Sequence, residues 1–162
     1  MTNFGRRPHL TVAGVPAGRS LTDLMPVDPT PDGSCIVVVA TNAPLHAHTL
    51  RRLAKRAGLG LARTGSTARE GSGEIILAFS TAQRIPLSNP TGRLDLSVLA
   101  QSGYSTGGLN LLFEATIDAT EEAVLNALLA ATTTTGRRGR VLHAVPHDWL
   151  RALLTAGWKP ME

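Results

Sequence analysis

Two short stretches of the chain are continuously apolar, and they set the expected architecture. One covers Cys35–Ala40 and the other covers Ile75–Phe79, and β-branched residues are frequent in both. Apolar runs without polar alternation are typical of strands that are covered on both faces. We therefore expect an α/β fold, in which layers of helix and sheet enclose these two strands.

Helical periodicity follows each of the two apolar runs. Apolar residues recur at helical spacing from Leu50 to Leu61, and four basic residues between them face away. Asn42 is the expected N-cap of this helix, and Gly58 and Gly60 are the expected end.

The strongest helix prediction is the alanine-rich segment Leu109–Thr132, which can present one broad apolar side. Within it, Asp118–Glu121 resembles a capping box, so the helix could instead begin there. Elsewhere, Pro and Gly predict irregular connections at 16–33 and 83–108. Shorter elements are expected at the ends of the chain: strands at Leu10–Val15 and Val141–Val145, and a final helix that opens at Pro146–Asp148.

The basic charge of the chain does not by itself indicate a nucleic-acid partner. The net charge is +4 and the pI is about 10.2, but the cations are dispersed and aromatic residues make up 4% of the chain. A base-stacking surface therefore lacks its usual residues. A nucleic-acid-binding domain stays the alternative from a different class, and salt-dependent retention on DNA or RNA would support it.

The sequence offers little for metal binding or membrane insertion. Its single cysteine, Cys35, excludes a disulfide framework within one chain, and the five histidines lack acidic or cysteine companions at metal-ligand spacing. We expect the histidines to be structural or surface residues. No apolar run is long enough to cross a bilayer, and the start of the chain lacks a signal sequence, so we expect a cytoplasmic protein.

Ser34 is the first candidate for chemistry, because it follows Gly33 at the start of the first apolar run. A serine in this position is most often a turn or cap residue. If the chain were cut before Ser34, however, its hydroxyl would stand beside a free α-amine, which places a base next to a nucleophile. Gly33 permits the strained geometry in which that hydroxyl attacks the preceding carbonyl.

The second candidate group lies just before the second apolar run, in the sequence Gly71-Ser72-Gly73-Glu74. In an extended chain, Ser72 and Glu74 point the same way. If the two strands are neighbours, Ser34, Ser72 and Glu74 could gather at one end of the sheet; a plain polar turn is the alternative. Near the start of the chain, the amide of Asn3 could donate to an oxyanion.

A set of segments then carries a family resemblance. In order along the chain, they read GSCIVVVATNAPL, LRRLAKRAGLGLARTGS, SGEIILAFSTA, LFEATIDATEEAVLNALLAA and VLHAVPHDWL. Together they resemble the β-subunit of the L-aminopeptidase D-amidase/D-esterase family, which includes β-peptidyl aminopeptidases and nylon-oligomer hydrolases. The start, NFGRRPHLTVAGVPAG, is similar to the end of that family's α-subunit. The resemblance implies part of a four-layer α/β/β/α sandwich, with residues 1–33 as α-subunit end and linker and 34–162 as the catalytic domain.

The resemblance also implies a chemistry. It implies autoproteolysis between Gly33 and Ser34, Ser34 as N-terminal nucleophile, Ser72 and Glu74 as supporting residues, and Asn3 in the oxyanion hole. It further implies that neither a metal nor a cofactor takes part, and that the substrate is a small peptide or amide with a free amino terminus.

The family's α-subunit is long, whereas about thirty residues precede Ser34 here. We therefore expect a truncated or split enzyme that works as a homo-oligomer or with a separate α-subunit-like chain. The alternative is an inactive remnant that binds another chain. In either case, the isolated chain should expose an apolar surface.

Overall fold

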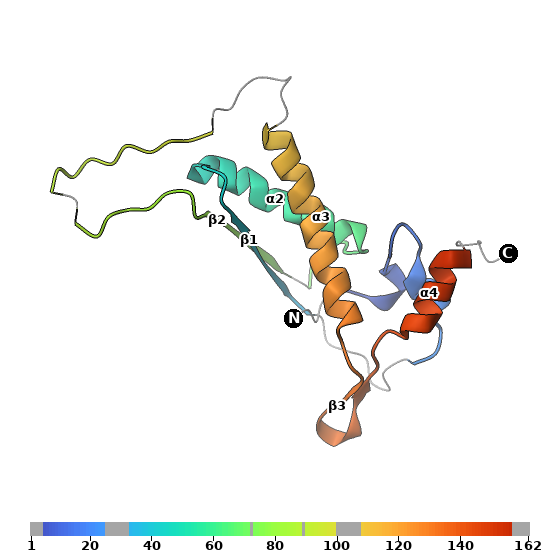
Figure 1. Ribbon diagram of the computed structural model, residues 1–162. Coiled ribbons are helices and arrows are strands. Elements are labelled where there is room, and N and C mark those ends of the chain that lie inside the picture. The colour runs from blue at the N-terminus through green and yellow to red at the C-terminus, as the bar shows by residue number, and fades with distance from the viewer. Residues whose placement is uncertain (1–4, 25–32, 72, 89, 100–107, 157–162) are drawn as a thin grey trace.

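The structure is a computed structural model that describes residues 5–24, 33–71, 73–88, 90–99 and 108–156 (Figure 1). Its two longer strands form one parallel pair, and a short antiparallel pair lies near the carboxyl end. The elements in chain order are η1 (Arg7–His9), α1 (Ala17–Ser20), β1 (Cys35–Thr41), α2 (Ala47–Arg63), β2 (Glu74–Ser80), α3 (Gly108–Leu129), β3 (Thr134–Thr135), η2 (Arg137–Gly139), β4 (Val141–Leu142) and α4 (His147–Ala156).

Both predicted central strands are confirmed, and they are direct neighbours. β1 pairs with β2 in parallel, from Cys35 opposite Glu74 to Thr41 opposite Ser80. A parallel pair needs a crossover connection, and α2 supplies it, which completes a β–α–β unit. The amino ends of both strands therefore lie at the same edge of the sheet.

The two faces of this sheet differ in a way that the continuous apolar runs did not predict. On one face, Val39 packs against the apolar cluster that α2 and α3 build around Leu53 and Phe113. The other face has no covering layer among the described residues, and Ile36 is 73% exposed there. The predicted cover on both faces is thus missing within the described chain, and the predicted exposed apolar surface is confirmed. The side chains on the open face are Ile36, Val38, Ile75, Leu77 and Phe79.

The boundaries predicted for α2 are wrong at both ends. The helix begins at Ala47 with His46 as N-cap, not at Asn42. The reason lies in Pro44, because a residue before proline is disfavoured in the helical conformation. Gly58 and Gly60 do not end the helix, which continues to Arg63.

Close packing between α2 and α3 explains a glycine in the helix interior. A Cβ at Gly60 would lie 2.5 Å from the carbonyl oxygen of Ile117 in α3. The absence of a side chain at Gly60 therefore permits the close approach of the helices, and tertiary packing outweighs the low helix propensity of glycine. α3 itself begins at Gly108, which confirms the longer of the two predicted helices over a start at Asp118.

The predicted strand at Leu10–Val15 is wrong. The segment turns back on itself, and the backbone groups of Val12 and Val15 exchange two hydrogen bonds of 2.9 Å. Ala13 and Gly14 form the tip of this turn with φ values of 49° and 78°. Glycine adopts a positive φ without steric cost, which favours a turn over a continuous strand.

The carboxyl-terminal elements pack against this turn. The predicted final helix is confirmed as α4, and its Leu150 forms a buried cluster with Val12 and Ala17. The strand expected at Val141–Val145 is shorter than predicted and pairs only over Val141–Leu142, with β3. No described helix has both the length and the apolar character needed to span a membrane.

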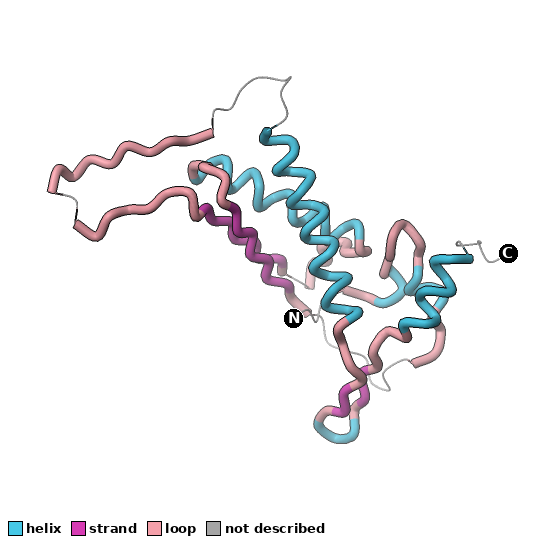
Figure 2. The backbone as a smooth tube through the Cα atoms, in the orientation of Figure 1, coloured by secondary structure: helices cyan, strands magenta, loops and turns pink. Residues whose placement is uncertain are grey.

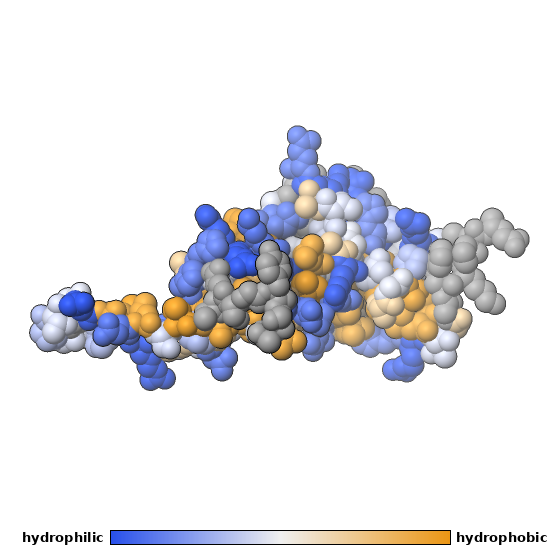
Figure 3. Space-filling model, turned by 90° about the horizontal axis from the view of Figure 1, so that it is seen from above, coloured by the Kyte–Doolittle hydropathy of each residue, from blue (hydrophilic) through white to orange (hydrophobic). Residues whose placement is uncertain are grey.

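A long connection follows β2, and its described part, residues 81–88 and 90–99, is here called the arm. It contains neither helix nor strand, in agreement with the prediction for this region. The arm extends away from the rest of the molecule (Figure 2). Its apolar side chains lie in the open, with Leu87 fully exposed, and Figure 3 shows apolar and charged residues intermixed along it.

Candidate active site

The register of the parallel strands brings two predicted site residues to one edge of the sheet. The backbone N–H of Cys35 donates to the carbonyl oxygen of Gly73 over 3.1 Å, and Cys35 is paired with Glu74. Ser34 immediately precedes Cys35, so Ser34 and Glu74 lie at the same amino-terminal edge. Ser72 and Asn3 fall outside the described residues, and their place in the site stays a prediction.

Ser34 lies at the solvent side of this edge. The residue is exposed, and the strand that follows it begins with the buried Cys35. A rigid strand therefore anchors one side of Ser34, while the hydroxyl is open to a reacting group. Such a combination of fixed backbone and accessible hydroxyl is what a nucleophilic serine needs.

The carboxylate of Glu74 carries the least satisfied polar atom of the site. Its Oε1 is buried and has no hydrogen-bond partner among the described residues. A buried acceptor without a donor costs free energy and is rare in folded proteins. Glu74 thus offers a free acceptor position to a donor that is not among the described residues.

Cys35 is a neighbour of the site that the sequence analysis did not assign to it. Burial raises the pKa of its thiol above the ordinary value of 9.0, and the nearby charge of Glu74 raises this pKa further. The thiol therefore stays protonated near neutral pH, and a protonated thiol is a poor nucleophile. Ser34 is the better nucleophile candidate at this edge. In the sequence, the signal that could have assigned Cys35 to the site was its position directly after Ser34.

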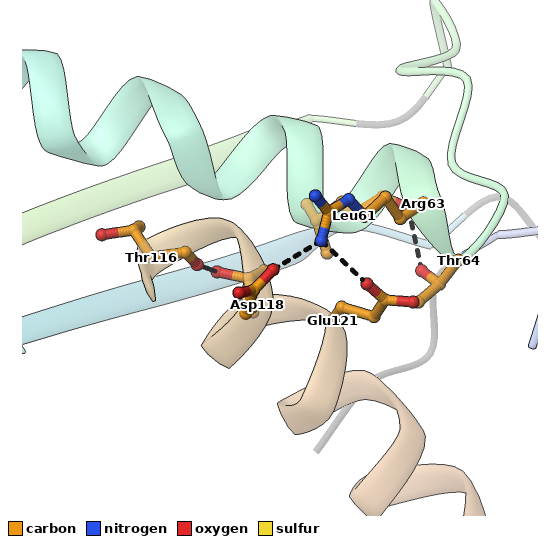
Figure 4. A network of polar contacts seen from close by, with 7 residues as sticks. Leu61, Arg63, Thr64, Thr116, Asp118 and Glu121 are labelled. Carbon is orange, nitrogen blue, oxygen red and sulfur yellow. Dashed lines mark hydrogen bonds and ion pairs between the residues drawn. The ribbon is translucent and has the colours of Figure 1, made fainter. Parts of the chain in front are cut away.

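An ion pair at the end of α2 holds the chain that leads toward this edge (Figure 4). Nη1 of Arg63 lies 2.5 Å from Oδ1 of Asp118 and 3.3 Å from Oε2 of Glu121, both on α3. Hydrogen bonds to these two carboxylates raise the pKa of Arg63. The hydroxyl of Thr64 donates to the carbonyl of Leu61 over 2.8 Å and closes the end of the helix. The start of the connection to β2 is thereby held against α3.

The described residues contain no group of three or more histidine, cysteine or acidic side chains that could hold a metal ion. Two histidines make contacts that fit structural roles. The Nε2 atom of His147 lies 2.9 Å from the carbonyl oxygen of Leu129, and that of His46 lies 3.3 Å from the hydroxyl of Thr49.

A large groove begins beside the candidate site. Its volume is about 1180 Å³, and Cys35 and Gly5 are among the residues that line it. Gly5 marks where the described chain starts, two residues after Asn3 in the sequence. The groove therefore connects the sheet edge with the described part of the amino-terminal segment.

Solved structures with this fold define the class of protein. The chain matches a protein from Pyrococcus horikoshii OT3 with a TM-score of 0.82 and 40% identity, over 96% of this chain and 41% of that one. It matches the L-aminopeptidase D-Ala-esterase/amidase of Ochrobactrum anthropi with a TM-score of 0.81 and 35% identity, over 95% and 41%. That enzyme is described as a prototype for the serine aminopeptidases and as a new variant among the Ntn hydrolase fold. The described residues thus have the α/β architecture of the matching part of both structures, the second of which is an aminopeptidase of the Ntn hydrolase fold, as expected.

The family follows from the sequence match. Residues 1–142 match Peptidase family S58, and the chain belongs to this family. It is also 42% identical over 167 aligned positions to the beta-peptidyl aminopeptidase BapA of Sphingosinicella microcystinivorans. That alignment covers 94% of this chain and 41% of the relative, so the chain spans about two fifths of the length of the relatives it matches.

Proposed function

We propose that this chain forms the nucleophile-bearing part of a serine-type N-terminal-nucleophile aminopeptidase or amidase. The observation that carries the proposal is the pairing of Cys35 with Glu74, which places an exposed serine and a half-buried carboxylate at one sheet edge. Membership of Peptidase family S58 and the named aminopeptidase relatives support the same reaction class.

Maturation begins with a cut between Gly33 and Ser34. The Ser34 hydroxyl attacks the carbonyl carbon of Gly33, and the peptide C–N bond breaks as the C–O ester bond forms. Water then hydrolyses this ester, which leaves a carboxylate on Gly33 and an α-amine on Ser34. In this scheme residues 1–33 and 34–162 become separate pieces, the second of which is the catalytic domain.

The same hydroxyl then acts on the substrate. The α-amine of Ser34, with an ordinary pKa near 8, accepts the hydroxyl proton as the oxygen attacks the scissile carbonyl. Ser72 orients this pair, and the Asn3 amide donates to the developing oxyanion, a contribution of about 3 kcal/mol in comparable sites. The tetrahedral intermediate then collapses: the scissile C–N bond breaks, the Ser34 α-amine returns its proton to the leaving nitrogen, and the amine product departs. Water hydrolyses the remaining acyl-enzyme ester, which releases the acyl group as a carboxylic acid and regenerates the Ser34 hydroxyl.

Glu74 selects substrates with a free amino terminus. A substrate ammonium group can supply the donor that its buried Oε1 lacks among the described residues. Charge-assisted hydrogen bonds of this type are stronger than neutral ones, and they would orient the scissile bond toward Ser34. The proposed substrates are therefore small peptides or amides with a free amine.

Activity in this proposal requires a further polypeptide, equivalent to the part of BapA that this chain does not match. The chain spans 41% of the length of BapA, and no described residue covers one face of its sheet. We propose that a separate α-subunit-like chain, or an assembly of several copies, completes the enzyme. An inactive remnant that only binds such a partner is the second candidate, and the same open face supports it.

One experiment separates these candidates. The chain is co-expressed with the unmatched part of BapA, and the purified assembly is assayed with amino-acid p-nitroanilides that carry a free or an acetylated amine. The proposal predicts turnover of the free-amine substrate alone, loss of turnover in Ser34→Ala, and at least a 100-fold loss of kcat/KM in Glu74→Gln. Full activity of Ser34→Ala would refute the nucleophile. An assembled but inactive wild type would establish the remnant.

A further inference from the structure

The groove beside the sheet edge is larger than a small-molecule site. It runs between the amino-terminal segment, the carboxyl-terminal half of α3, β4 and α4. Its volume of about 1180 Å³ lies above the roughly 300–1,000 Å³ of typical ligand pockets. It corresponds to roughly ten residues of α-helix, if a helix is taken as a cylinder about 10 Å wide that rises 1.5 Å per residue.

The walls of the groove are mainly aliphatic. Val12 and Leu150 are buried in its wall, and four of its leucines are exposed to solvent: Leu24 at 38%, Leu129 at 42%, Leu142 at 56% and Leu154 at 37%. Contiguous apolar surface of this kind marks an interface in soluble proteins. A partner with an apolar face would remove these leucines from water.

The charge along the groove is of one sign. Its lining includes Arg6, Arg7 and Arg151, and none of the described lining residues is acidic. Nη1 of Arg7 donates to the backbone carbonyl of Asp23 over 2.6 Å. Arg151 lies 3.3 Å from Asp148, an ion pair whose side chains are 77% and 97% exposed, and such exposed pairs contribute little. Carboxylates on a partner would complement this rim.

We propose that the groove binds an amphipathic polypeptide segment with an apolar face and acidic margins, contributed by the counterpart of the unmatched part of the family. The size argues for a polypeptide, the leucines for its apolar face, and the arginines for its acidic margins. The relatives carry about three fifths of their length outside the match, which provides the source of such a segment. This inference rests on the proposed function for the existence of a completing partner, and it adds the surface on which that partner binds.

Co-purification with a defined partner tests the groove without an activity readout. The chain carrying Ser34→Ala is co-expressed with the tagged unmatched part of BapA, and the molar ratio of the two chains is measured after purification. In this background, Leu129→Glu and Leu154→Glu should each lower the recovered chain at least fivefold. Leu87→Glu, at an equally apolar but fully exposed position in the arm and outside the groove, is the control and should match the parent.

The charged rim has its own prediction. The double variant Arg6→Glu/Arg151→Glu should lower the recovery of the chain with its partner at least fivefold at 50 mM NaCl. The complex of the parent chain should itself weaken as the salt concentration is raised, because salt screens these charges. Circular dichroism melts of each variant verify that it is folded. Absence of a complex with the parent chain, or equal recovery of the groove variants and Leu87→Glu, would overturn the proposal. Self-association of the chain that Leu129→Glu abolishes, with co-purification unchanged, would assign the groove to a second copy instead.

Because the test uses the Ser34→Ala chain, its result is independent of catalysis. A complex that depends on the groove but shows no activity with wild-type Ser34 would uphold the interface and reject the enzymatic proposal. Enzymatic activity of the wild-type assembly, together with normal binding by the groove variants, would uphold the enzymatic proposal and reject the interface.

Discussion

Replacement of Gly60 by alanine is a direct probe of the packing of α2 on α3. Its Cβ would lie 2.5 Å from the carbonyl oxygen of Ile117 and 2.6 Å from the Cβ of Thr120. The Thr120 hydroxyl donates to the carbonyl of Thr116 over 2.7 Å, which ties that side chain to its own helix. The contact is therefore between groups that cannot move aside individually, and the two helices must separate to admit a methyl group.

Gly58 provides a matched control two residues away in the same helix. A Cβ there meets nothing within 4 Å. Glycine in a helix interior costs about 0.8–1 kcal/mol relative to alanine, so Gly58→Ala should stabilise the fold by about that amount. Gly60→Ala gains the same propensity but incurs an overpacking cost of about 1–3 kcal/mol. We therefore expect Gly60→Ala to lie between neutral and about 2 kcal/mol less stable than wild type, and about 1–3 kcal/mol less stable than Gly58→Ala.

Urea unfolding followed by circular dichroism measures both changes. The midpoint should rise for Gly58→Ala and fall for Gly60→Ala, with the slope m unchanged if the unfolded states are alike. The difference between the two variants is the most secure quantity, because the propensity gain cancels. A Gly60→Ala protein as stable as Gly58→Ala would refute the close approach of the two helices.

Three further predictions concern the site and its support. Because burial raises the pKa of Cys35 above 9.0, the free energy of unfolding should fall as pH rises past 9, and Cys35→Ala should lack that loss in urea titrations between pH 8 and 10. Arg63→Ala should lower the melting temperature only slightly, since Arg63 and Asp118 are largely exposed to solvent, and the loss should shrink in 1 M NaCl. Glu74→Gln should leave the circular dichroism melt of the chain near that of wild type, while it slows the turnover of free-amine substrates. A variant that no longer folds would contradict a role limited to substrate recognition.

Much of the central β–α–β unit could be predicted from the apolar pattern, and its limits have physical causes. The runs at Cys35–Ala40 and Ile75–Phe79 predicted β1 and β2 because few other structures accommodate such sequences. They also predicted cover on both faces, which the described chain does not provide, because a sequence does not say which chain supplies a layer. The ends of α2 were missed since Pro44 and the packing around Gly60 outweighed local capping and propensity.

The sequence predicted the candidate site only on the condition that the two strands are neighbours in the sheet. The proximity of Ser34 and Glu74 depended on β1 and β2 being neighbours in register, which the structure shows. The buried, unpartnered oxygen of Glu74 and the burial of Cys35 arise from packing against other elements, so no local sequence signal could reveal them. The roles of Ser72 and Asn3 stay predictions.

Intact mass spectrometry of the co-expressed assembly tests the central claim most directly. The chain has a mass of 17.1 kDa when whole. The account predicts two pieces, one that ends at Gly33 and one that begins at Ser34, and a Ser34→Ala chain that stays whole. An uncut wild-type chain in an assembly that hydrolyses free-amine substrates, or a cut in the Ser34→Ala chain, would contradict it.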